Sequence, residues 1–159
     1  MPVLYFTRKG MAKFKQDIEA VQAELADMSS RVAHVAETGG DQYHDNPSFN
    51  QLTGEIRQTN QRLEGMIATL RQGSIIDKPI SAEKVRIGTR VKVVWNGEPA
   101  EWYIGGYGES DLDNGILAYN TPLADLILGK KVGEIGRGPI GRRGITTVEI
   151  KEISIAKDD

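Results

Sequence analysis

The chain has 159 residues, of which 39% are apolar and 26% are charged, and it contains no cysteine. This composition is typical of one or two small globular domains, and it excludes a disulfide framework, a thiol nucleophile and a thiolate zinc site. The 20 basic and 22 acidic side chains give a net charge of −2, so the protein does not bind duplex nucleic acid through bulk charge. Because the sequence contains neither a signal-peptide pattern nor an apolar run of the roughly 20 residues that span a membrane, we expect a cytoplasmic protein without a membrane partner.

Residues 11–35 carry an apolar stripe with helical spacing. Its members follow one another at alternating intervals of three and four residues: Met11, Phe14, Ile18, Val21, Leu25, Met28, Val32 and Val35. Such a stripe, sustained over more than three heptads, is typical of a coiled coil. Thr7 is the predicted N-cap of this helix, and Gly39 and Gly40 are its predicted end.

A second stripe with the same spacing follows. Its members are Phe49, Leu52, Ile56, Thr59, Leu63, Met66 and Leu70. Asn46 and Pro47 suit the cap and the first position of this helix, and Gly73 suits its end. Because only the short segment 39–46 joins the two stripes, the helices must fold back antiparallel into a coiled-coil hairpin with this segment at its tip. The seam lies inside the hairpin, which predicts a monomer.

After residue 77 the pattern changes from helical to alternating, and glycine becomes frequent. We predict an N-terminal hairpin domain of residues 1–77, a linker of residues 78–84 and a C-terminal domain of residues 85–159. The fold class is α+β, because a helical hairpin precedes a small sheet that carries one short helix.

The C-terminal elements are predicted from alternation and turn residues. Strands are expected at 90–95, 101–104, 116–119 and 147–155, and a short helix is expected at 122–128. Asn96 and Gly97 tolerate the positive φ angles of a type I′ turn, so they predict a hairpin between the first two strands.

Asp41 and Asp45 are the candidate functional residues of the tip. Taken alone, they are most simply explained as loop and cap residues. Two carboxylates on an exposed loop bind Mg²⁺ poorly, because the ion gives up its water reluctantly and needs further ligands. A complete metal site would therefore have to be shared with a partner.

Several short motifs lie in order along the chain. They are Thr7-Arg8-Lys9-Gly10-Met11-Ala12-Lys13-Phe14, Gly40-Asp41 with Asp45-Asn46-Pro47-Ser48-Phe49, Glu64-Gly65-Met66-Ile67 with Ile75-Ile76-Asp77, Asn120-Thr121-Pro122-Leu123-Ala124, and Leu128-Gly129-Lys130-Lys131-Val132-Gly133-Glu134. In order and spacing this set resembles the motifs of the bacterial GreA/GreB family of transcript-cleavage factors. The resemblance extends over nearly the whole chain.

The resemblance implies a fold, a partner and a role. It implies an FKBP-like C-terminal domain that docks on RNA polymerase, and a coiled coil that enters the secondary channel of the polymerase. In the family, the tip carboxylates help the polymerase hold a second Mg²⁺ and orient a water that attacks backtracked RNA. Asp41 and Asp45 would then act within the polymerase active centre and share Mg²⁺ with it, at the nascent RNA 3′ end. The protein would be a cofactor and not itself an enzyme, with no sequence-specific DNA recognition.

Two further groups of residues are candidates for contacts in such a complex. Arg31, Arg57 and Arg62 flank the upper part of the hairpin, where guanidinium groups suit RNA phosphates, although a solvated charged face explains them equally well. The predicted polymerase-docking residues are Pro122, Leu123, Leu126, Lys130 and Lys131.

Three alternatives stay open. The tip acids of the family lie three residues apart and end in Glu, whereas Asp41 and Asp45 lie four apart with Tyr43 and His44 between them. Because catalytic placement matters at about the 1 Å level, this difference suggests a Gre-like homologue that occupies the channel and inhibits the polymerase. The FKBP-like sheet suggests a prolyl isomerase by analogy alone. A plain interaction module would pair its hairpin with another chain.

Overall fold

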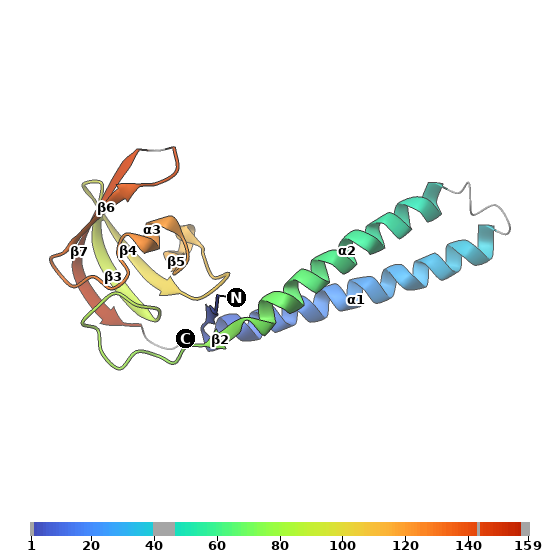
Figure 1. Cartoon of the computed structure of the whole chain (residues 1–159), viewed down its shortest axis with the longest axis horizontal. Helices are drawn as coiled ribbons and strands as arrows, with labels where there is room; N and C mark the ends of the chain where they lie inside the picture. Colours follow the sequence, from blue (N-terminus) through green and yellow to red (C-terminus); the bar gives the residue numbers. More distant parts are fainter. Residues whose placement is uncertain (1, 40–46, 143, 157–159) are drawn as a thin grey trace. The chain divides into compact units, whose positions relative to one another are not determined.

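The computed structural model describes residues 2–39, 47–142 and 144–156 (Figure 1). Along the chain the elements are β1 (Leu4–Phe6), α1 (Arg8–Gly39), α2 (Pro47–Arg71), β2 (Gly73–Ile75), β3 (Thr89–Trp95), β4 (Glu98–Gly105), the 3₁₀ helix η2 (Leu112–Asn114), β5 (Ile116–Ala118), α3 (Pro122–Asp125), β6 (Ile135–Pro139) and β7 (Ile145–Ile155). The α+β fold class is confirmed, with a helix pair followed by a mixed sheet that carries a short helix.

The chain forms two compact units. The helical unit contains Pro2 and residues 12–73, and the C-terminal unit contains residues 3–11 together with residues 74–159. The chain passes from one unit to the other within α1, after Met11, and within β2, after Gly73.

The helical unit is built from the two predicted stripes. Every stripe residue of α1 from Met11 to Val35 is buried or half-buried, and all the residues between them are exposed. The stripe of α2 is likewise buried or half-buried along its length, and α1 and α2 lie side by side in Figure 1. The pairing is antiparallel, and Arg62 Nη2 of α2 reaches Glu24 Oε2 of α1 at 2.9 Å. The predicted helical hairpin is therefore present.

Both helices begin where local chemistry predicts. The N–H of Gly10 donates to Thr7 Oγ1 at 3.0 Å, and the N–H of Met11 donates to the Thr7 carbonyl at 2.9 Å. Thr7 is thus the N-cap of α1. Pro47 is the first residue of α2, where its missing N–H costs no helical hydrogen bond.

The C-terminal unit is organised around a five-stranded sheet in the order β5-β4-β3-β7-β6. The β4 and β5 strands run parallel, and the other neighbouring strands run antiparallel. At the β3–β4 turn Asn96 has φ 50° and Gly97 has φ 85°, which confirms the predicted type I′ turn. A bulge interrupts the β3–β7 register between Lys92 and Val93.

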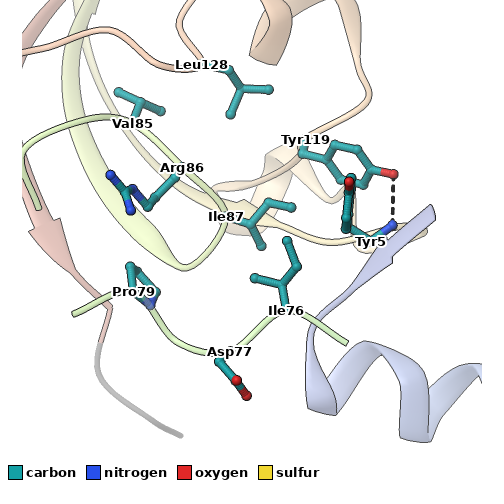
Figure 2. Close-up of a pocket in the computed structure, with 9 residues that line it drawn as sticks. All are labelled: Tyr5, Ile76, Asp77, Pro79, Val85, Arg86, Ile87, Tyr119 and Leu128. Atoms are coloured by element: carbon teal, nitrogen blue, oxygen red, sulfur yellow. Dashed lines mark hydrogen bonds between the residues drawn. The ribbon is translucent and has the colours of Figure 1, made fainter. Parts of the chain in front are cut away.

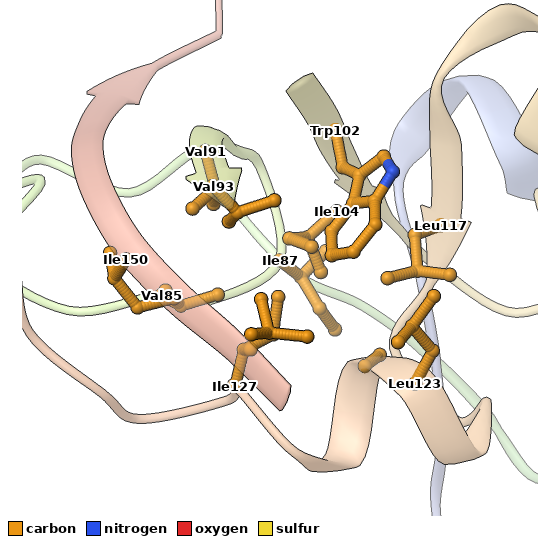
Figure 3. Close-up of a cluster of buried hydrophobic side chains, with 12 residues drawn as sticks. Val85, Ile87, Val91, Val93, Trp102, Ile104, Leu117, Leu123, Ile127 and Ile150 are labelled. Atoms are coloured by element: carbon orange, nitrogen blue, oxygen red, sulfur yellow. The ribbon is translucent and has the colours of Figure 1, made fainter. Parts of the chain in front are cut away.

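One face of this sheet forms the hydrophobic core (Figure 3). Alternate residues of β3 and β7 point into it, and α3 with the turn after it covers them. The core residues are Val85, Ile87, Val91, Val93, Trp102, Ile104, Leu117, Leu123, Ala124, Ile127, Val148 and Ile150. Clean alternation on a half-buried sheet explains why the sequence pattern located β3 and β7.

Three strands were not predicted from the sequence. The β1 and β2 strands are only three residues each and pair with one another. The β6 strand has the sequence Ile-Gly-Arg-Gly-Pro, which has low strand propensity. The short helix is also shorter than predicted, because α3 ends at Asp125. Within the part of the chain that the structure describes, neither long helix is apolar enough to cross a membrane.

Candidate functional site

The candidate tip residues Asp41 and Asp45 lie outside the described residues. In the sequence they occupy the segment that joins the end of α1 at Gly39 to the start of α2 at Pro47. What the structure describes is the pair of helices that carries this segment.

The two helices form a paired support for the tip. The α1 helix has 32 residues and α2 has 25, so the shorter one extends for about 38 Å at 1.5 Å per residue. Their seam is mostly apolar, but it includes Thr59, whose side chain is buried in α2. A paired seam of this length stabilises the two helices against one another.

The three candidate RNA-binding arginines have different surroundings. Arg31 Nε lies 3.3 Å from Asp27 Oδ2, and Arg62 is paired with Glu24. Arg57 is exposed, and among the described residues its guanidinium has no ion-pair partner. Both paired arginine side chains are more than half exposed, so these ion pairs are weak and readily exchanged.

The register of the hairpin brings two of these arginines to a similar height. Because Arg62 lies opposite Glu24, antiparallel pairing places Arg57 opposite residue 29, and Arg31 lies about 3 Å further along the hairpin. Arg62 is about two turns more distant from the tip than Arg31. Arg57 and Arg31 are therefore the two candidates closest to the tip segment.

The predicted docking residues do not all lie on the surface. Pro122 and Lys131 are exposed, whereas Leu126 and Lys130 are half-buried. Leu123 is only 7% exposed and belongs to the hydrophobic core, because α3 turns its apolar side toward the sheet. The α3 helix itself is fixed by Thr121, whose hydroxyl donates to the Ala118 carbonyl at 2.8 Å and accepts from the Ala124 N–H. The surface near α3 therefore consists of Pro122, the outer part of Leu126 and the lysines.

The start of α1 forms a cluster that sequence reasoning missed. Thr7 Oγ1 donates to Glu109 Oε1, and the same carboxylate oxygen accepts from the Gly106 N–H at 2.9 Å. Gly106 is required here, because a Cβ at this position would lie 2.7 Å from the Thr7 backbone nitrogen. The sequence offered no local signal for this contact, since Thr7 and Glu109 are 102 positions apart.

The described residues do not contain a metal centre of their own. Across residues 2–39, 47–142 and 144–156, no group of three or more histidine, aspartate or glutamate side chains lies close enough to hold an ion. The two tip aspartates supply carboxylate oxygens, which Mg²⁺ prefers, but two groups do not complete its octahedral shell. Their donor chemistry fits an ion only where another molecule supplies the remaining ligands.

Comparison with known proteins gives a consistent result. Residues 80–155 match the family model described as "Transcription elongation factor, GreA/GreB, C-term". Transcription elongation factor GreA of Chloroherpeton thalassium is 27% identical over 154 residues, which cover 95% of this chain and 96% of the relative. GreA of Thermoanaerobacter pseudethanolicus is 28% identical over 156 residues, which cover 96% of this chain and 97% of the relative.

A solved structure aligns over the same length. The crystal structure of GreA factor homolog 1 (Gfh1) of Thermus thermophilus matches 96% of this chain and 99% of its own, with 18% identity and a TM-score of 0.44.

Proposed function

Because the chain belongs to the GreA/GreB family of transcription elongation factors, we propose that it binds RNA polymerase through its secondary channel and stimulates cleavage of backtracked RNA by the polymerase. The observation that carries this proposal is the helical hairpin. Two long helices pair along their whole stripes, and the segment that joins them contains two aspartates. Such a hairpin is suited to deliver carboxylates to a catalytic centre in another protein.

In this proposal Asp41 and Asp45 contribute carboxylate ligands to a Mg²⁺ that polymerase and RNA phosphate also hold. When bound, such an ion activates water as a nucleophile and stabilises the leaving oxygen. The contribution of this chain is placement, because the paired helices restrict where the two carboxylates can be. The protein is then a cofactor of the polymerase nuclease and not an enzyme by itself. Such a partner also implies action in the cytoplasm, as a monomer bound to one polymerase.

The candidate arginines of the hairpin and the candidate docking residues near α3 are proposed to contact different partners. Arg57, with Arg31 at a similar height, is proposed to contact phosphates of the displaced RNA 3′ end. The exposed Pro122 and Lys131, with the accessible parts of Leu126 and Lys130, are proposed to contact the outside of the polymerase. No sequence-specific DNA contact is part of the proposal, since the net charge of −2 provides no general affinity for duplex DNA.

The test uses a stalled, backtracked elongation complex with labelled RNA. Wild-type protein is expected to release short 3′ RNA fragments in the presence of Mg²⁺. Asp41→Asn and Asp45→Asn keep the side-chain shape but remove the charge, and each is expected to lower the cleavage rate at least about tenfold. Asp17→Asn is the matched control, because Asp17 is an exposed acid of α1 that pairs with Lys13. All four proteins should compete equally for polymerase with a fluorescently labelled wild-type protein.

An inhibitory role is the second candidate. The four-residue spacing of Asp41 and Asp45 with Tyr43 and His44 between them favours it, since a longer loop changes the reach of both carboxylates. In that case the wild-type protein competes for polymerase and slows nucleotide addition, but it releases no RNA fragment. Failure to compete for polymerase at all would contradict both roles.

A further inference from the structure

The C-terminal unit contains a cavity that the proposed function does not use. Its volume is about 400 Å³, which lies within the range of small-molecule sites. Figure 2 shows its lining, which is apolar or aromatic except for Asp77 and Arg86. All of the lining residues belong to the C-terminal unit.

Two walls of the cavity are fixed by the fold. Val85 and Ile87 are core residues, and Val85 is held to the turn after α3 through its N–H to Lys130 and its carbonyl to Gly129. On the opposite side the Tyr5 N–H donates to Tyr119 Oη at 3.0 Å, and the two rings pack edge to face with centroids 5.8 Å apart. The cavity is therefore formed before any ligand arrives, which lowers the entropy cost of binding.

Pro79 also lines the cavity, and Gly88 allows its ring to lie there. Gly88 has a φ of +94°, and a Cβ built on it would lie 2.6 Å from Pro79 Cδ. Only glycine allows both this backbone conformation and the close approach of the proline ring. The segment that carries Pro79 is thereby held at the edge of the cavity.

The two charged residues of the lining differ in their partners. Asp77 Oδ1 accepts a hydrogen bond from Arg8 Nη2 at 3.1 Å, so its negative charge is compensated. Arg86 is exposed, and within the described part of the chain its guanidinium has neither an ion pair nor a hydrogen bond. Among the described residues, no acidic side chain therefore compensates the positive charge that Arg86 carries at the edge of this apolar cavity. A planar carboxylate is the anion that a guanidinium group binds best, through two parallel hydrogen bonds.

We propose that this cavity binds a small amphipathic carboxylate, with an aromatic or branched apolar body against Ile87, Tyr119 and Leu128 and its carboxylate on Arg86. The apolar body removes hydrophobic surface from water, and the carboxylate supplies orientation. The proposal predicts a preference for an acid over a neutral molecule of the same shape. The expected preference is about tenfold, as for one charge-assisted contact at a partly exposed site.

The test uses the full chain, isotopically labelled at isoleucine, leucine and valine methyl groups. The probes are 4-phenylbutyrate, its neutral counterpart 4-phenyl-1-butanol, and acetate, which has the carboxylate without the apolar body. The butyrate is expected to shift the methyl signals of Ile76, Ile87 and Leu128 in a saturable manner. The alcohol should bind at the same residues about tenfold more weakly, and acetate should not saturate them.

Three variants separate the contributions of charge and shape. Arg86→Gln is expected to abolish the preference for the acid and to leave the affinity for the alcohol unchanged. Arg90→Gln is the matched control, because Arg90 is an exposed arginine of β3 that pairs with Glu101 and does not line the cavity. Ile76→Trp places a larger side chain in the cavity and is expected to weaken both the acid and the alcohol, with the remainder of the methyl spectrum unchanged.

Several results would overturn the proposal. These are equal affinity for acid and alcohol in the wild type, retention of the acid preference in Arg86→Gln, methyl shifts confined to residues outside the cavity, or no saturable shift up to the solubility limit of the butyrate. RNA cleavage is not a readout in this experiment, so its outcome is independent of the proposed polymerase function.

Discussion

Thr7 uses a single hydroxyl for two purposes. It accepts from the Gly10 N–H and so caps α1, and it donates to Glu109 in the loop after β4. A hydroxyl can do both at once because it has one proton and two lone pairs. The first turn of α1, which lies in the C-terminal unit, is thereby connected to the loop after β4.

This double role predicts the effect of two substitutions at Thr7. Thr7→Val keeps the shape but removes both hydrogen bonds, so we expect it to lower the free energy of unfolding by about 1–2 kcal/mol. Thr7→Ser keeps the hydroxyl and is expected to cost less than about 0.5 kcal/mol. Urea denaturation followed by circular dichroism measures both. Thr53→Val on α2 is a control, since within the described part of the chain the Thr53 hydroxyl donates only to backbone carbonyls of its own helix.

Arg57 and Arg62 provide a matched pair for the proposed RNA contact. Arg62 is compensated by Glu24, whereas Arg57 has no ion-pair partner among the described residues. We expect Arg57→Gln to reduce the RNA cleavage rate several-fold at low salt, with the difference from wild type shrinking as salt rises. Arg62→Gln should have a smaller effect. Cleavage rates at two or more salt concentrations measure this, and an equal loss for both variants would argue against a specific role for Arg57.

Two glycines lower the stability of the α2 helix. Gly54 and Gly65 lie within it, and a Cβ at either position would have no neighbouring atom within 4 Å outside the helix's own nearby backbone. Glycine in a helix costs up to about 1 kcal/mol relative to alanine, because it loses more conformational freedom on folding. Neither packing nor backbone conformation therefore requires glycine at these two positions.

Gly54→Ala and Gly65→Ala are each expected to raise the stability of the helical unit by about 0.5–1 kcal/mol. Thermal unfolding followed at 222 nm measures the gain, and the two effects should add because the sites are three turns apart. Gly106→Ala is the contrasting variant. Its Cβ would meet the Thr7 backbone, so it should destabilise the protein. A loss of stability in either α2 variant would contradict the conclusion that glycine is not required at these two positions.

At the scale of the whole molecule, residues 3–11 belong to the C-terminal unit. Phe6 is fully buried, with its ring 5.3 Å from that of Tyr107. The Tyr107 N–H donates to the Tyr5 carbonyl at 2.7 Å, and the Ile76 N–H donates to the Phe6 carbonyl at 2.8 Å. The C-terminal unit is therefore assembled from two separated parts of the sequence.

Phe6→Ala is accordingly expected to destabilise the C-terminal unit by about 3–4 kcal/mol, because it removes a fully buried ring. Both tryptophans, Trp95 and Trp102, lie in this unit, so tryptophan fluorescence during urea denaturation follows its unfolding directly. Tyr5→Ala at the neighbouring exposed position should cost much less. An unchanged fluorescence midpoint in Phe6→Ala would contradict the assignment of β1 to this unit.

Local patterns were sufficient for much of the fold. The stripe from Met11 to Val35 located α1 because its burial follows alternating intervals of three and four residues, which are visible in the sequence. Asn96 and Gly97 predicted their turn because few residue pairs adopt two successive positive φ angles. Asp41 and Asp45 were likewise identified as candidate functional residues by their position between two stripes, and their proposed roles came from the family resemblance.

The sequence by itself determined the helical hairpin, the β3–β4 turn, the α+β class and the resemblance to the GreA/GreB family, since each depends on periodicity or short motifs. Only the tertiary structure decided that β6 is a strand, that β1 belongs to the C-terminal unit, that Leu123 is a core residue and that Arg86 lies at a cavity. A Cβ on Gly136 would lie 2.0 Å from the Leu126 carbonyl oxygen, so the glycines that conceal β6 in the sequence are the ones that allow it to pack. Such contacts join positions that are separated in the sequence, so the local spacing of residues does not predict them.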